Sequence, residues 1–264
     1  MEQALQPVSS ARVFGALLLR DVHVTRRELP FFLIRTTMQP FLFLIVFGYL
    51  LPKMGFLGAQ YKATLLPGIL GVSLTLSAIQ SVALPMVQDF GWTNEIEDRL
   101  LAPIPIPLIA IEKILVGTIQ GVIAGLFVLP VARLIMGPIP GFTLAHAGET
   151  IFIALLGSAT FSAIGLYMGA AIKPQQIGFM FSLIIAPMLF FGCAYYPWRG
   201  LDVVRVMKYA VLINPLVYVA EGLRAVLTPA GPHMNLLVVI AVLTGMLVVI
   251  GWLGVRSFVK RAVK

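Results

Sequence analysis

Hydrophobic residues gather in six long stretches of this chain, and the short segments between the stretches hold most of its charged residues. Each stretch approaches the roughly 20 residues that a helix needs to cross about 30 Å of hydrocarbon. The pattern therefore predicts an all-α, polytopic membrane protein with six transmembrane helices. The predicted spans are residues 31–51, 63–86, 108–135, 150–172, 178–195 and 236–253.

The segment before the first span, residues 1–30, combines apolar with basic side chains. Apolar residues recur at helical spacing between residues 13 and 22, with Arg residues before, between and after them. This pattern predicts an N-terminal amphipathic helix in the headgroup layer, where basic side chains are attracted to anionic lipids. A basic leader that only directs membrane insertion is an equally good interpretation. We expect one domain over residues 1–264, made of this leader, the helices of residues 31–253 and a basic tail of residues 254–264.

A seventh apolar stretch, residues 209–227, is interrupted by polar residues. It contains Asn214, Pro215, Glu221 and Arg224. A charge at the centre of a span costs about 2.5–3.5 kcal/mol, whereas each Leu or Ile contributes only about 0.3–0.6 kcal/mol in return. We therefore expect a re-entrant or surface helix between the fifth and sixth spans. Such a segment is tolerated at membrane depth only where protein or water surrounds it, which makes it a functional candidate.

The composition agrees with a membrane protein. Hydrophobic residues make up 59% of the chain, charged residues make up 11%, and the mean hydropathy is +0.96. Too few polar side chains are left to cover a water-soluble surface. The lone cysteine, Cys193, permits no internal disulfide. The net charge of +8 is explained by membrane topology and anionic lipid, and we expect no nucleic-acid partner.

The basic residues predict the orientation of the chain. Residues 254–264 contain Arg256, Lys260, Arg261 and Lys264 and no acidic residue, and the leader carries several Arg residues. The positive-inside rule places both termini in the cytoplasm. Two ends on one side require an even number of crossings, which favours six spans over seven. The expected location is the cell membrane.

The loop between the second and third spans, residues 89–107, is unusually acidic for a cytoplasmic loop. Asn94 with Glu97 three residues later resembles a capping box, and the prolines from Pro103 onward prevent the helix from continuing. The sequence thus predicts a short charged helix that a soluble partner can grip, with an ordinary solvated turn as the alternative. The polar residues of this predicted helix are Asn94, Glu95, Glu97, Asp98 and Arg99.

A few polar and aromatic residues within the spans are candidates for a substrate path. Gln39 and Gln80 lie inside the first two spans, and Tyr195 and Tyr196 lie at the end of the fifth. The glutamines either join helices by hydrogen bonds or line a pathway. The tyrosines either form an interfacial aromatic belt or stack on a ligand.

Taken together, these features resemble the permease subunit of type-2 ABC exporters, a group that carries drugs, lipids and polysaccharides. The resemblance rests on the order of basic leader, six spans, acidic helix followed by Pro, and the Asn-Pro-Leu-x-Tyr start of residues 214–224. It implies that two permeases, identical or different, form a pathway at their interface and that two cytoplasmic ABC ATPase subunits drive it. Residues 94–99 would then be the ATPase coupling helix. The outer gate would include Asn214, Pro215, Tyr218, Glu221 and Arg224.

The chain lacks the residues that chemistry of its own would need. No Gly-Lys dipeptide occurs, so there is no Walker A loop, and ATP and Mg are expected on the partner. His23, His146 and His233 all fall outside the predicted spans, so we expect no catalytic, cofactor-binding or metal-binding residues. The leading expectation is outward transport of amphiphilic drugs or lipid-like molecules. An exporter of lipid-linked polysaccharide and an ATP-independent channel or secondary transporter are the alternatives.

Overall fold

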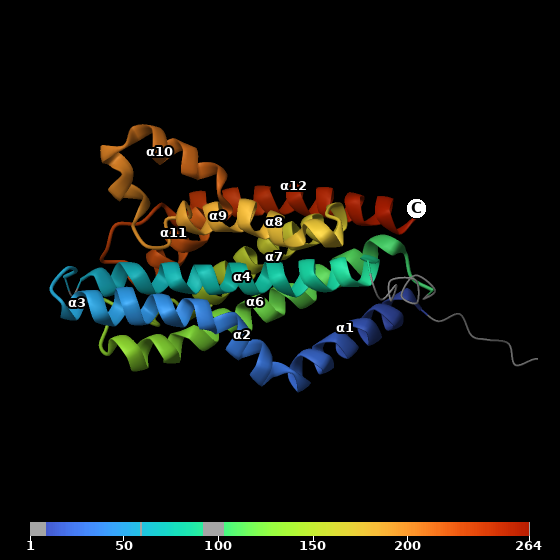
Figure 1. Cartoon of the computed structure of the whole chain (residues 1–264), viewed down its shortest axis with the longest axis horizontal. Coiled ribbons are helices and arrows are strands. Elements are labelled where there is room, and N and C mark those ends of the chain that lie inside the picture. Colours follow the sequence, from blue (N-terminus) through green and yellow to red (C-terminus); the bar gives the residue numbers. More distant parts are fainter. Residues whose placement is uncertain (1–8, 59, 92–102, 264) are drawn as a thin grey trace, which may run out of the picture.

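The computed structural model describes residues 9–58, 60–91 and 103–263, and its regular structure within these residues is entirely helical. Figure 1 shows long helices running side by side in a bundle, with α1 set at an angle to it and α10 projecting from it. The long helices are α1 (Ser10–Arg27), α2 (Leu29–Phe43), α4 (Tyr61–Gly91), α6 (Ile106–Met136), α7 (Ala147–Ala171), α11 (Pro215–Leu227) and α12 (Leu236–Ala262). The short ones are α3 (Leu51–Lys53), α8 (Ile177–Met180), α9 (Ala186–Phe190) and α10 (Arg205–Ala210).

Short stretches of other helix types join these elements. Two are π-helical, η1 (Leu44–Leu50) between α2 and α3 and η3 (Phe181–Ile185) between α8 and α9. Three are 3₁₀-helical, namely η2 (Pro174–Gln176), η4 (Trp198–Val203) and η5 (Val211–Ile213).

Five helices in the described residues are long and apolar enough to cross a membrane, and a bent pair can supply a sixth crossing. The expected all-α, polytopic membrane fold is therefore confirmed. The first span is continuous through α2, η1 and α3, so its helix covers Leu29–Lys53. The other four are α4, α6, α7 and α12.

The predicted fifth span, residues 178–195, is not among these five, because its helix ends at Phe190 and the stretch Phe181–Phe190 is only a short apolar helix. Beyond it the chain turns, and Cys193 adopts a φ of 53°, in the left-handed region that a non-glycine residue rarely occupies. The turn directs the carbonyl oxygens of Cys193 and Ala194 toward Arg224 of α11. The helix ends earlier than its hydrophobicity predicts because the carbonyl groups of Cys193 and Ala194 accept hydrogen bonds from Arg224.

The segment predicted to be re-entrant consists of two helices joined at Asn214, and it is the bent pair that can supply the sixth crossing. The stretch Arg205–Ile213 meets Pro215–Leu227 at an angle of 99°. The first arm is largely exposed, whereas nearly every residue of α11 is buried against α4, α7 and α12. A buried polar helix enclosed by protein is the environment that the charged residues of this segment require.

Figure 1 places the start of α1 and the C-terminal end of α12 at one end of the bundle, and α3, α10 and α11 at the other. We call these the terminal end and the α11 end. Helix α4 runs between them, packs against α2, α6, α7 and α11, and is the most buried of the five spans. At about 1.5 Å per residue, its 31 residues extend about 46 Å, so one continuous helix, with Pro67 and Pro85 in its interior, connects the two ends.

Close packing at the α11 end depends on a glycine. A Cβ added to Gly68 of α4 would lie 2.5 Å from the carbonyl carbon of Ala194, which is backbone and cannot rotate away. The chain after α9 therefore lies directly on α4 at this point. Any side chain at position 68 would push the turn at residues 191–195 off the helix.

We expect Gly68→Ala to destabilise the protein by about 1–3 kcal/mol, the usual cost of overfilling a packed core. The thermal unfolding midpoint of the purified protein in detergent measures this effect. Gly245→Ala in α12 is the matched control, because no atom lies within 4 Å of its added Cβ, and it should leave the midpoint unchanged or raise it. Equal midpoints for the two variants would contradict the close approach at Gly68.

Candidate functional site

The N-terminus of α11 is fixed by Asn214 and Pro215. The Asn214 side chain accepts a hydrogen bond from the Leu216 amide at 3.0 Å, which caps the helix. The amide nitrogen of the same side chain, Nδ2, donates a hydrogen bond to the Met188 carbonyl of α9 at 2.7 Å. Pro215 occupies the first helical turn, where its missing N–H costs nothing. The predicted Asn-Pro pair thus begins the helix and attaches it to the shortened fifth span.

Glu221 and Arg224 form an ion pair on one face of α11. They are three residues apart, so they face the same side of the helix, and Arg224 Nη1 lies 2.8 Å from Glu221 Oε1. The Glu221 side chain is fully buried, and only 2% of the Arg224 side chain is exposed. Both charges are therefore removed from water and lipid.

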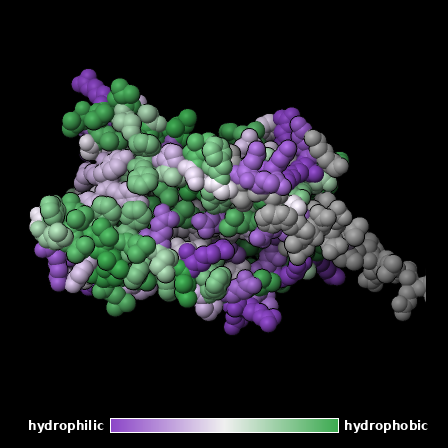
Figure 2. All heavy atoms as spheres, in the orientation of Figure 1, coloured by the Kyte–Doolittle hydropathy of each residue, from purple (hydrophilic) through white to green (hydrophobic). Residues whose placement is uncertain are grey.

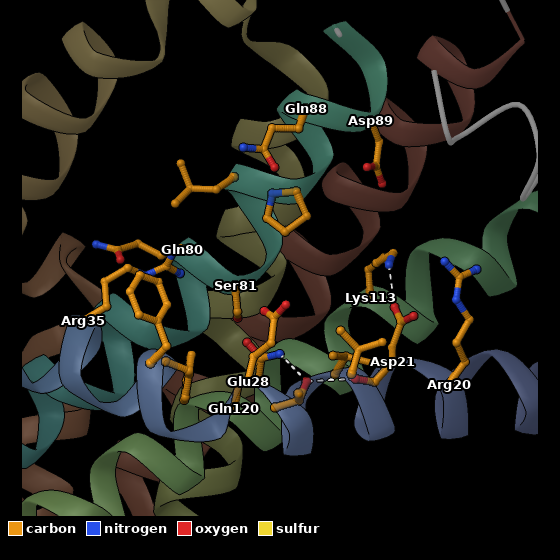
Figure 3. Close-up of a pocket in the computed structure, with 17 residues that line it drawn as sticks. Arg20, Asp21, Glu28, Arg35, Gln80, Ser81, Gln88, Asp89, Lys113 and Gln120 are labelled. Carbon is orange, nitrogen blue, oxygen red and sulfur yellow. Dashed lines mark hydrogen bonds and ion pairs between the residues drawn. The ribbon is translucent and has the colours of Figure 1, made fainter. Parts of the chain in front are cut away.

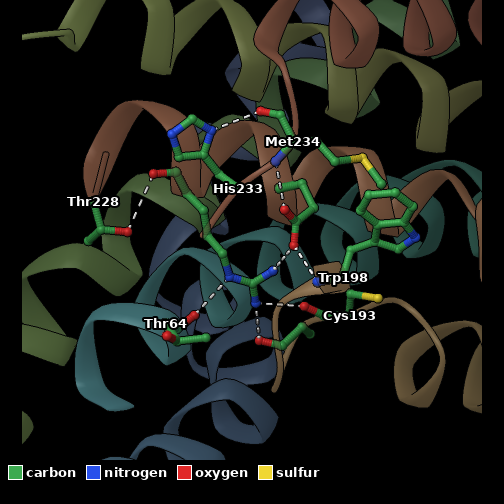
Figure 4. A network of polar contacts seen from close by, with 9 residues as sticks. Thr64, Cys193, Trp198, Thr228, His233 and Met234 are labelled. Atoms are coloured by element: carbon green, nitrogen blue, oxygen red, sulfur yellow. Dashed lines mark hydrogen bonds and ion pairs between the residues drawn. The ribbon is translucent and has the colours of Figure 1, made fainter. Parts of the chain in front are cut away.

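Main-chain groups from other segments complete the coordination of this pair (Figure 4). Arg224 donates to the carbonyl oxygens of Cys193 at 2.6 Å, Ala194 at 3.0 Å and Thr64 at 3.2 Å. Glu221 accepts from the amides of Trp198 at 2.8 Å and Met234 at 2.9 Å.

The network joins four segments to α11: the start of α4, the turn after α9, the start of η4 and the loop before α12. A buried ion pair is stable only when further hydrogen bonds satisfy both partners. That condition is met at Glu221 and Arg224, so the pair fixes the position of the re-entrant segment.

Tyr218 contributes to the same end of the molecule. Its hydroxyl donates to the Leu212 carbonyl at 2.9 Å, which ties α11 to η5 across the 99° bend. The structure therefore brings all five predicted outer-gate residues onto one helix and its cap. Their role as a gate stays a prediction.

A polar cavity of about 540 Å³ lies in the terminal half of the molecule, between α1, α2, α4 and α6 (Figure 3). Its polar lining comes from Arg20, Asp21, Thr25, Glu28, Arg35, Gln80, Ser81, Gln88, Asp89, Lys113 and Gln120. Apolar side chains such as Phe31, Phe32 and Leu84 complete the wall. A polar cavity beside membrane-spanning helices is a place where a polar group can be held away from lipid.

The leader is a helix, as the sequence predicts, and polar contacts hold it against α6. Lys113 of α6 lies 2.7 Å from Asp21 of α1, and both side chains are largely buried. One turn further along α1, Thr25 accepts a hydrogen bond from Gln120 at 2.7 Å. These contacts make α1 one wall of the cavity. Its predicted place in the headgroup layer remains an expectation.

The four predicted substrate-path residues do not come together. Gln80 lines the polar cavity, but Gln39 is exposed on α2 and is not part of the lining. Tyr195 packs its ring against Phe43 at a centroid distance of 4.9 Å, near the α11 end. Tyr196 donates to the Phe190 carbonyl at 3.1 Å. The two tyrosines thus have packing and turn-forming contacts, and a role in transport stays a prediction for all four.

Sequence reasoning did not find the contact between α1 and α6. Asp21 is an acidic residue in an otherwise basic leader, and Lys113 follows Glu112 near the start of the third span. The opposite charges of Asp21 and Lys113 are visible in the sequence. Nothing in the sequence indicates that these two residues lie close together in the fold. Glu112 is fully buried beside Lys113, with 3.9 Å between their charged atoms.

The predicted coupling helix, residues 94–99, lies outside the residues that the structure describes. Helix α4 ends at Gly91, shortly before it, and α6 begins at Ile106, shortly after it. Within the described ranges, no cluster of His, Cys, Asp or Glu side chains is arranged to hold a metal ion.

These features define a polytopic helical membrane protein with a buried ion pair at the α11 end and a polar cavity between its helices. Residues 12–228 match the ABC-2 type transporter family, and the chain belongs to this family as a membrane permease subunit. The resemblance inferred from the sequence is thereby confirmed. Members of this family carry no catalytic activity of their own.

Curated relatives support the same assignment. The chain is 26% identical over 198 residues to the inner membrane transport permease YadH of Escherichia coli strain K12, which covers 69% of this chain and 70% of that protein. The same values hold for YadH of Escherichia coli O157:H7 and of Shigella flexneri. The comparison with solved structures gave no significant match.

We expect Arg224→Met to destabilise the protein by about 3–5 kcal/mol, because it leaves the buried Glu221 carboxylate without its cation. Thermal unfolding in detergent measures the loss. The double variant Glu221→Gln with Arg224→Met should recover part of it, since no uncompensated charge remains.

Glu149→Gln is the control for Arg224→Met, because it changes an exposed contact with His146 that should contribute at most about 1 kcal/mol. An Arg224→Met variant as stable as Glu149→Gln would show that the buried pair does not fix α11.

Proposed function

We propose that this chain is the transmembrane subunit of an exporter that moves amphiphilic drugs or lipid-like molecules outward across the cell membrane. Separate ATPase subunits supply the energy. Membership in the ABC-2 type transporter family supports the transport function, and the relatives named inner membrane transport permease support the cell membrane as its location. The observation that carries the cargo class is the polar cavity, which is enclosed by helices whose outer faces are apolar.

An amphiphile fits such a cavity because it has two unlike parts. Its polar end needs hydrogen-bonding partners, and its apolar end is most stable in lipid. Phe31, Ile34 and Met38 of α2 are exposed beside the cavity and offer a continuous apolar exit to the bilayer. A fully hydrophilic cargo would use the polar lining but not the apolar surface beside it.

We propose that ATPase movement reaches the α11 end through α4. Residues 94–99, directly after α4, are the proposed coupling helix for two cytoplasmic ABC ATPases. At the other end of the same helix, Thr64 accepts a hydrogen bond from Arg224, and Gly68 contacts Ala194. A displacement of one end of this continuous 31-residue helix would therefore be passed to the contacts of the buried ion pair at the other end.

A second permease copy completes the proposed pathway. The first span is only 28% buried in its most apolar window, and Leu42, Val46 and Tyr49 are exposed in its half nearer the α11 end. We assign the second copy to this half, so the stretch 31–38 beside the cavity stays open to the bilayer. We propose that opening occurs between the first span of one copy and the fifth span of the other.

Charge reversal tests the coupling. The double variant Glu97→Arg and Asp98→Arg should abolish ATP-dependent transport in proteoliposomes and reduce co-purification of the ATPase, because the acidic contact surface is lost. Glu149→Arg reverses one exposed acidic charge near the α11 end and should leave both measurements intact. Transport that continues in the double variant excludes this coupling site, and transport without any ATPase indicates a channel or secondary transporter.

Cysteine labelling tests the proposed orientation. Val203→Cys in η4 replaces a residue that is 91% exposed, and Val263→Cys after α12 replaces one that is 72% exposed. A membrane-impermeant maleimide should label position 203 in intact cells and position 263 only after permeabilisation. The parent chain is the control, since its lone Cys193 is buried. The reverse pattern would place the terminal end outside.

A further inference from the structure

We propose that the polar cavity between α1, α2, α4 and α6 binds the anionic head group of an amphiphile, with Arg35 as the principal cation and Gln80 as its partner. The inference rests on the proposed function, because it names the chemical class of the exported molecule and its site of entry. It assigns a role to polar residues that the buried network at the α11 end does not use.

The cavity reaches membrane depth. From Gln80 to the end of α4, the stretch 81–91 corresponds to about 16 Å of helix at about 1.5 Å per residue. The predicted second span ends at residue 86, so about 9 Å of this length, roughly a third of the hydrocarbon core of about 30 Å, lies between Gln80 and the hydrocarbon boundary. Figure 2 shows hydrophilic side chains over the terminal half of this face reaching toward its middle, beside a largely apolar surface. The inner end of the cavity is therefore well inside the bilayer.

The charges around the cavity are unevenly distributed. Asp21 is paired with Lys113 at 2.7 Å, and Asp89 is only 7% exposed. Glu28 begins the turn into α2, whereas Arg35 lies about 10 Å further along the helix, toward the middle of the span. The deepest charge that lines the cavity is therefore the positive one on Arg35.

Arg35 and Gln80 form a suitable anion site. They come from different helices, α2 and α4, and both line the inner part of the cavity (Figure 3). A guanidinium group matches the two oxygens of a phosphate or carboxylate, and a glutamine amide adds a further donor. A snorkelling arginine would instead run along its own helix to the membrane surface. The cavity of about 540 Å³ is large enough for a phospholipid head group.

The occupant is an amphiphile and not a free anion, because the wall beside Arg35 is apolar. Phe31 and Phe32 line the cavity, and Phe31, Ile34 and Met38 are exposed next to it on α2. A head group held at Arg35 can leave its chains in the bilayer along this surface. Inorganic phosphate would lose hydration at this depth without that compensation.

Binding of a fluorescent short-chain phosphatidylglycerol to the purified chain in detergent, without ATPase, tests the site. Phosphatidylcholine with the same chains and inorganic phosphate are the comparison ligands. We expect phosphatidylglycerol to bind more tightly than phosphatidylcholine, and millimolar phosphate not to displace it. Arg35→Gln should weaken binding by about tenfold to a hundredfold, as expected for the loss of a charge-assisted hydrogen bond. Arg35→Lys should weaken it less, and Gln80→Leu should also weaken it.

Arg27→Gln is the matched control, because Arg27 is exposed at the end of α1 and is not among the described residues that line this cavity. The Arg27→Gln variant should bind phosphatidylglycerol with the affinity of the parent chain. The thermal unfolding midpoints of all variants should equal that of the parent chain. Equal binding of the two lipids, displacement by phosphate, or full affinity in Arg35→Gln with an unchanged midpoint would each overturn the site.

The failure of this site is distinguishable from failure of the export function. Equal ATP-driven transport of both lipids by the parent chain and Arg35→Gln overturns the site and leaves export standing. If binding depends on Arg35 but ATP drives no movement of the lipid, the proposed binding site is supported and the proposed export function is wrong.

Discussion

The ion pair between Glu221 and Arg224 is the constraint on which the α11 end of this protein depends. Two charges at this depth are stable only if every donor and acceptor finds a partner. Those partners are main-chain groups of segments that are distant in the sequence. The turn after α9, the end of the fifth span and the approach to α12 are therefore arranged around α11.

Helix α4 relates this network to the rest of the molecule. Its first turns contact the network at Thr64 and Gly68, and its later turns line the polar cavity through Gln80 and Gln88. The two polar regions of the chain thus lie on one long, buried helix. Other polar groups on α4 form hydrogen bonds to neighbouring helices. For example, Ser73 donates to the Ala124 carbonyl of α6. The arrangement gives a transporter a single continuous helix that contacts both the cavity and the re-entrant segment.

Hydrophobic patterning predicted most of the fold, because a bilayer requires long apolar helices and penalises charge strongly. The same penalty singled out residues 209–227 as a re-entrant or surface helix, but the break at Asn214, where α11 begins, was not predicted. The early end of the fifth span was not predictable, because the groups that bind Arg224 are carbonyls, which every residue type possesses. The packing of Tyr195 on Phe43 and the ion pair of Asp21 with Lys113 were missed because both depend on long-range tertiary contacts.

The π-helical stretch Leu44–Leu50 in the first span changes how that span is to be compared with its relatives. A π-helical turn behaves as a single inserted residue, which rotates all later side chains by about 100° around the axis. A helical wheel drawn through the whole span therefore assigns the wrong outward face to positions beyond it. Relatives that lack this insertion preserve the same surface only with a one-residue gap, so an ungapped alignment of the first span misplaces every position that follows.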